Sequence, residues 1–382
     1  MIGDMSHPRT GRGAVRQTAV IGSLQRPRAG NLTLRAVTTA AGQTVRLQRV
    51  RLTTDSEVRW GDGTTTPLPA NMNNDVSRTY ANAGTYDIVI PNAQEITQLH
   101  LADSRLSMLN TEQLQHSFIT SFQINNLSNC QILSDHMSKW NITSEFMVSG
   151  NTGLHVLNTA HMANWRPTLI IMDFWRATIT GSVINSFDLS AMNPTALTLV
   201  ALSTGATITI NSSHFTGWNI MSFFAMMCSV SGNYLINTEH IAHFRPTTLN
   251  CNTMHSSGTY NFNTHHFRGM NPTDIRFHNL PAGTVTINDV TDFNSFLRCT
   301  TARFENNSWN QTMTDRCLQA WWNNMPTRTA TRGTGTINVG GTNAAPSGIF
   351  QNATPPTTGK EFAWKLLFES APARTWATVT TN

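Results

Sequence analysis

Histidines recur at one position of a phrase that is repeated along the chain, and imidazole is the side chain here with the most chemical potential. The row consists of His136, His161, His214, His240 and His266. With the nearby His243 and His265, a stack of imidazoles could bind a transition metal or sense pH. The same position holds Gln113, Asp188 and Cys317 in other copies, at a first helical turn where polar groups help to cap. We therefore interpret the histidines as surface or capping groups and predict no metal site.

Other catalytic patterns are missing from the sequence. It contains no GxSxG elbow, HExxH, P-loop or dinucleotide fingerprint. Glycoside hydrolysis needs two carboxylates across a groove, and the 20 acids after residue 52 follow no repeat register. We predict that the protein is not an enzyme and assign it no catalytic, metal-binding or cofactor-binding residue and no cofactor.

The phrase is clearest as "NTEHIAHFRPTTLN", residues 237–250. Its first residue defines an Asn position that recurs nine times, at intervals of 23 to 27 residues. This position holds Asn110, Leu133, Asn158, Asn185, Asn211, Asn237, Asn263, Asn288 and Thr314. The residue before it is always apolar: Leu109, Ile132, Leu157, Ile184, Ile210, Ile236, Phe262, Ile287 and Met313. We predict that this preceding column is buried.

Two further columns have helical spacing. Four residues after the Asn position stand Leu114, Met137, Met162, Leu189, Phe215, Ile241, Phe267 and Leu318, with Phe293 one place later. Seven residues after it stand Ser117, Trp140, Trp165, Met192, Trp218, Phe244, Met270 and Trp321, with Phe296 one place later. Such spacing places both columns on one face of a short helix. The aromatic column could stack on sugars, but we favour core packing because it shares that face.

The polar letters of the phrase mark where each short helix begins and ends. Asn followed by Ser or Thr accepts hydrogen bonds from first-turn N–H groups. Pro167, Pro194, Pro246 and Pro272 end the helix. Two β-prone runs precede the Asn position, so each copy predicts strand, turn, short strand and helical turn. Because one copy cannot bury its own apolar face, the copies must stack into a solenoid, about 40 Å long at strand spacing.

This array, residues 94–326, resembles the degenerate leucine-rich repeats of BspA-like surface proteins. The resemblance implies an α+β repeat solenoid of about nine turns, although the strand pattern is blurred to forms such as "ITQLHLADS". A three-sided parallel β-helix has a similar period and stays the alternative. Residues 327–382 lose the period, and we expect them to form a C-terminal cap over the last repeat.

The segment before the array reads as a small β-sandwich, residues 31–93. "VRWGDGT" (58–64) and "YANAGTYDIVI" (80–90) resemble a PKD-type immunoglobulin-like domain, in which these stretches belong to the framework. In that family a His usually occupies the place of Arg78. We interpret Asp62 as a turn residue that bonds neighbouring backbone N–H groups.

Charge and cysteine content limit the class of protein. Charged residues make up only 12% of the chain, so the surface is neutral and polar, as in extracellular filaments, adhesins and virion parts. Residues 1–52 hold nine Arg and one acid, and residues 1–30 form a basic arm that we expect to dock on protein. The arm lacks aromatic residues, so we do not expect nucleic-acid binding. Five widely spaced cysteines, at positions 130, 228, 251, 299 and 317, predict free core thiols.

No apolar run resembles a signal-peptide core or is long enough to span a bilayer, so we expect neither Sec-type export nor membrane insertion. An adhesin-like chain without an export signal suits a bacteriophage virion, as a tail or head fibre present in several copies. Its partners would be other virion proteins and a host surface glycan or protein. The alternatives are a bacterial cell-surface BspA-like adhesin and, third, a polysaccharide-degrading β-helix enzyme.

Overall fold

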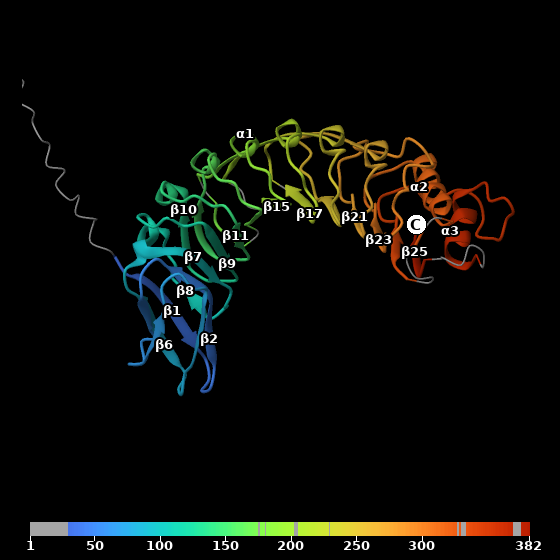
Figure 1. Ribbon diagram of the computed structural model, residues 1–382. Helices are drawn as coiled ribbons and strands as arrows, with labels where there is room; N and C mark the ends of the chain where they lie inside the picture. The colour runs from blue at the N-terminus through green and yellow to red at the C-terminus, as the bar shows by residue number, and fades with distance from the viewer. Residues whose placement is uncertain are drawn as a thin grey trace, which may run out of the picture.

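The computed structural model describes residues 30–382 except 175, 180, 202–204, 229, 327, 330–333 and 370–375. The predicted docking arm, apart from Gly30, lies outside the described residues. Figure 1 shows a small β-structure at the N-terminal end followed by a curved array that ends in two helices.

The N-terminal part is built from short antiparallel strands. These are β1 (Leu32–Thr38), β2 (Thr44–Leu52), β3 (Ser56–Arg59), β4 (Thr65–Leu68), β5 (Asn74–Thr79), β6 (Gly84–Ile90) and β8 (Leu106–Ser107). One sheet has the order β4-β3-β6-β1-β8, whereas β2 and β5 belong to a second sheet. Trp60 is fully buried, and the Tyr80 hydroxyl donates to its carbonyl oxygen at 2.8 Å. Asp62 accepts from the Thr64 N–H at 3.0 Å, which confirms its place as a turn residue.

The second sheet continues from this part into the array without a break. From β7 onward its strands are parallel, and we call the whole 13-stranded unit the inner sheet. Its array strands are β7 (Ile96–Leu101), β9 (Ser121–Asn125), β11 (Glu145–Ser149), β13 (Leu169–Asp173), β15 (Ala196–Ala201), β17 (Phe223–Cys228), β19 (Thr248–Asn252), β21 (Asp274–Arg276), β23 (Thr301–Arg303), β24 (Thr336–Asn338) and β25 (Thr378–Thr380). In Figure 1 these strands line the inner side of an arch, and the helical turns follow its outer side.

Most coils before β22 also carry a short second strand and one helical turn, in the order that the repeat predicts. The short strands are β10 (Cys130–Leu133), β12 (Gly153–Val156), β14 (Val183–Asn185), β16 (Thr207–Asn211), β18 (Asn233–Asn237), β20 (Thr259–Asn263) and β22 (Val285–Thr286). The turns are η1 (Ala93–Glu95), η2 (Thr111–Leu114), η3 (Ser134–Met137), η4 (Thr159–Met162), α1 (Ser186–Leu189), η5 (Ser212–Phe215), η6 (Thr238–Ile241) and η7 (Thr264–Phe267). The result is a β-rich repeat fold with long parallel sheets.

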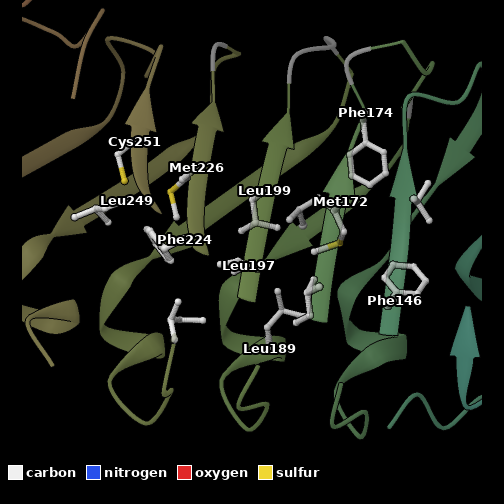
Figure 2. Packing of buried hydrophobic residues seen from close by; sticks show 14 of the residues in the cluster. Phe146, Met172, Phe174, Leu189, Leu197, Leu199, Phe224, Met226, Leu249 and Cys251 are labelled. Atoms are coloured by element: carbon white, nitrogen blue, oxygen red, sulfur yellow. The ribbon is translucent and has the colours of Figure 1, made fainter. Parts of the chain in front are cut away.

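The predicted apolar columns form the core. Residues of the column before the Asn position are at most 4% exposed, except the partly buried Met313. Those of the two helical columns are also at most 4% exposed, so the aromatic column packs in the core as predicted. Figure 2 shows Phe146, Met172, Leu199 and Met226 on successive inner strands, turned to this core. Burial of one continuous apolar seam holds neighbouring coils together.

Asparagine caps most of the helical turns. The side chains of Asn110, Asn158, Asn185, Asn211, Asn237 and Asn263 each accept a hydrogen bond from the backbone N–H two residues later. Thr314 departs from the predicted alignment, because it lies inside α2 (Gln311–Asn324). This longer helix begins after Asn310, whose side chain accepts from the Met313 N–H at 2.9 Å. The ninth copy therefore has its cap four residues earlier than the spacing predicted.

Coil length varies mainly at one corner of the coil. From the Asn position to the next inner strand, the first seven copies use eleven or twelve residues. The connector from an inner strand to its short partner strand ranges from three residues (150–152) to nine (174–182). The irregular interval of 23 to 27 residues therefore arises mainly in the connectors.

The tail adds to both the inner sheet and the helical end. Strands β24 and β25 extend the sheet, and α3 (Gly359–Phe368) packs beside α2. Trp321 lies edge-on to Trp376 at 5.3 Å between ring centroids, and the Arg328 guanidinium lies 3.8 Å from the Trp376 ring. These large side chains close the core at the last coils.

The cysteines behave as core thiols where their side chains are described. Cys130, Cys299 and Cys317 are free and buried, Cys251 is also buried, and the side chain of Cys228 lies outside the description. Burial raises the thiol pKa of Cys130 and of Cys299 to about 12. Such thiols stay protonated and unreactive at neutral pH.

Candidate functional site

The histidine row links successive coils. Each Nδ1 atom lies 2.8–3.1 Å from a hydroxyl oxygen of the preceding coil. The pairs are His136 with Thr111, His161 with Ser134, His214 with Ser186, His240 with Ser212, and His266 with Thr238. All five hydroxyls also accept the backbone N–H of the following Asn position, as Ser212 does from Asn237 at 2.9 Å and Thr111 from Leu133 at 3.0 Å. Of the two roles in our interpretation, surface or capping, the row has the first: its side chains are exposed or partly buried, and they join neighbouring coils instead of capping helices.

Aspartates take the place of the histidine in two other coils. Thr159 donates to Asp188 at 2.7 Å, and Thr264 donates to Asp292, because an ionised carboxylate can only accept. In either tautomer of the bonded imidazoles Nδ1 is engaged with the hydroxyl, a structural role that leaves this atom unavailable to a metal.

The remaining histidines of the group add no metal site. His243 donates through Nε2 to the Trp218 carbonyl at 2.7 Å, and His265 is half exposed. Within the part of the chain that the structure describes, no three His, Cys, Asp or Glu side chains come together as metal ligands.

The outward face of the 13-stranded inner sheet is a second candidate for a functional surface. Because side chains alternate along a strand, one residue of each strand contributes to a central row that crosses the array. The row reads His100, Gln123, Met147, Ile171, Thr198, Ala225, Asn250, Arg276, Arg303, Asn338 and Thr380. It is polar at its start, mostly apolar from β11 to β17, and basic at β21 and β23.

An apolar strip covers the middle of this face. It consists of Met147 on β11, Leu169 and Ile171 on β13, and Phe223 and Met227 on β17, all of intermediate exposure. Strands β13 and β17 are therefore apolar on both faces, whereas a sheet with one wet face usually alternates. An apolar patch bordered by polar groups is typical of a binding surface.

The basic end of the face is locally neutralised. The Arg276 guanidinium bonds Asp274 at 2.6–3.0 Å, and this partner raises the arginine pKa. Arg303 bonds Glu305 through Nε at 2.7 Å. His278 lies beside them with Nδ1 3.8 Å from Glu305, and burial lowers its pKa. These groups form fixed, paired charges suited to orienting a polar partner.

At the other end of the row, His100 is buried and neutral. Burial is the main cause that lowers its pKa to about 4, and its Nε2 lies 2.7 Å from the Ser121 hydroxyl. The repeat pattern alone did not single out this face of the array. The sequence does carry a signal for it in "LIIMD" (169–173) and "FFAMM" (223–227), where apolar residues occupy the positions that face both sides of the sheet.

Comparison of the chain with family models, curated proteins and solved structures finds no match. Among the described residues, no helix has the length and apolar character needed to cross a membrane. Any statement of function therefore depends on the geometry of the inner face and on the composition of the chain.

Proposed function

We propose that the protein is a receptor-binding structural component of a bacteriophage virion, a tail or head fibre whose array recognises the host surface. The observation that carries this proposal is the apolar strip at the centre of the concave sheet face, with polar residues and paired charges on either side. A concave face of this kind contacts a partner through many weak interactions. Several copies on one particle would multiply their effect through avidity.

We also propose that the coils are of the leucine-rich type. In the leucine-rich pattern, two buried apolar strand residues are followed by a buried asparagine. Two coils match this pattern: Phe146-x-Val148-x-x-Asn151 and Ala302-x-Phe304-x-x-Asn307. Asn151 donates to the Ile124 carbonyl at 3.1 Å and accepts from the Leu127 N–H at 2.9 Å, so it bonds to the preceding coil. A helical turn on the outer side of every early coil supports this type over a parallel β-helix.

The N-terminal sandwich is, in this proposal, a PKD-like module that attaches the array to the particle together with the basic arm. Arg78, which stands where the family usually has His, donates to Asp62 at 2.7 Å and so holds the turn. The substitution of Arg for His is thus compatible with the same framework. Deletion of residues 1–30 should lower the amount of protein incorporated into purified particles, and unchanged incorporation would contradict the docking role.

Binding of the labelled protein to host cells tests the recognition role. Ile171→Glu places a charge in the apolar strip and should reduce cell binding at least tenfold. Leu235→Glu is the matched control, because Leu235 is an apolar residue, 46% exposed, on the short strand β18. Equal binding by both variants would refute recognition through the inner face, and recovery of the protein from the bacterial envelope instead of particles would favour a cell-surface adhesin.

A further inference from the structure

A pocket of about 420 Å³ lies where the sandwich joins the array. Thr53 follows β2, Gln94 and Glu95 belong to η1, and three more lining residues come from the first two coils. These three are His116, Phe118 and Lys139. The volume lies in the lower part of the range for small-molecule sites, roughly 300–1,000 Å³, and would take one or two sugar rings.

Phe118 is the first sign that the pocket has a ligand. Its side chain is 64% exposed, so it contributes little to the core. It stands eight residues after the Asn position, where the next six copies carry only polar residues. These are Asn141, Arg166, Asn193, Asn219, Arg245 and Asn271. The repeat therefore does not require an aromatic residue at this place.

Polar groups in the pocket wall are the second sign. Gln94 Oε1 and His116 Nδ1 belong to two lining residues and have no hydrogen-bond partner among the described residues. Both atoms are covered by protein atoms, so a sugar hydroxyl would pair with them after a rotation of the side chain. The Glu95 carboxylate is held in place by the Thr53 hydroxyl and by the Gln94 amide. Together with Lys139, the pocket wall carries hydrogen-bond donors and acceptors, one negative carboxylate and one positive ammonium group.

We infer that this pocket binds a pyranose sugar of a surface glycan, with Phe118 against the ring face and Gln94 and Glu95 bonding its hydroxyls. The C–H groups on one face of a pyranose are apolar and suit the negative face of an aromatic ring. Each sugar hydroxyl both donates and accepts, which matches a wall of amide, carboxylate, hydroxyl and ammonium groups. The inference rests on the proposed function, to which it adds a ligand class and a second contact point apart from the apolar strip.

Titration of the full chain with single sugars tests the inference. Glucose, galactose, mannose, N-acetylglucosamine and galacturonate are added separately, and binding is followed by ligand-observed NMR. At least one sugar should bind, and Phe118→Ala should weaken it at least tenfold. Phe187→Ala is the matched control, since Phe187 is also 64% exposed but lies on α1, and it should leave binding unchanged. Gln94→Leu should weaken binding while the far-UV spectrum stays that of the wild type.

Binding of none of the five sugars, or equal binding by Phe118→Ala and wild type, would overturn the inference. Cell binding separates this failure from failure of the proposed function. A protein that adheres to cells but takes up no sugar refutes the pocket alone. A protein that binds a sugar but adheres to no cells refutes the recognition role and leaves the pocket standing.

Discussion

His155 makes the stability of the array depend on pH. It lies on β12 with its side chain fully buried and the ring 6.0 Å from that of Phe174, measured between centroids. Neither ring nitrogen has a hydrogen-bond partner among the described residues. Burial lowers its pKa from 6.5 to about 4, because the charged imidazolium would be cut off from water.

The sign and size of the effect follow from linkage. Below pH 6.5 the unfolded chain binds a proton at this residue, whereas the folded chain stays neutral down to about pH 4. The free energy of unfolding therefore falls as the pH is lowered through this window, by about 3 kcal/mol in total. Above pH 6.5 both states are neutral and the residue adds no pH dependence.

Two substitutions isolate this contribution. Between pH 7 and pH 4 the free energy of unfolding falls in the wild type. In His155→Leu and His155→Gln this fall should be smaller by about 3 kcal/mol. His155→Leu should also be the more stable of the two at pH 7, since it removes the unpaired polar atoms. Urea unfolding at four pH values measures this. A wild-type-minus-variant difference that is constant across the range would refute the assignment of a depressed pKa to His155.

Three further substitutions test the links between and within coils, each by urea unfolding. Ser212→Ala should cost about 1–3 kcal/mol, because the part-buried Asn237 N–H loses its acceptor; a change below about 0.5 kcal/mol would contradict the inter-coil role. Asn158→Ala should cost about 1 kcal/mol by removing a helix cap, and no loss would mean that water replaces it. Gly153→Ala should be the most damaging, because φ is +120° and the added Cβ would lie 2.1 Å from the Cys130 carbonyl oxygen; near-neutrality would show that the chain there can shift freely.

The core and the caps could be predicted from the sequence because they depend on local spacing. An apolar residue before the Asn position and another four after it must face inward once the turn is helical, as Ile236 and Ile241 do. The Asn237 cap likewise bonds a backbone group only two residues away. Prediction failed at Thr314, where the spacing persists but the one-turn helix has become the long helix α2.

The hydroxyl–imidazole pairs could not be predicted, because they join residues in different coils. Ser212 and His240 are 28 residues apart in the chain, and their contact depends on the register in which coils stack. The apolar strip depends on the same register, which places Met147 beside Ile171. The sequence shows that single strands such as "LIIMD" are apolar on both faces, but periodicity within one coil carries no information on the lateral alignment that joins these residues into a strip.

The connectors between inner strands and short strands differ in length, which bears on how the sequence of such a chain can change in evolution. Insertions and deletions in the connector between an inner strand and its short partner strand leave the other corner of the coil intact. That other corner, at the Asn position, carries the helix caps and the hydroxyl–imidazole pairs. Natural variants can therefore gain and lose residues in the connectors while the curvature and the order of the stacked strands persist. The rim of the arch becomes the place where lineages can acquire new sequence at the lowest cost to folding.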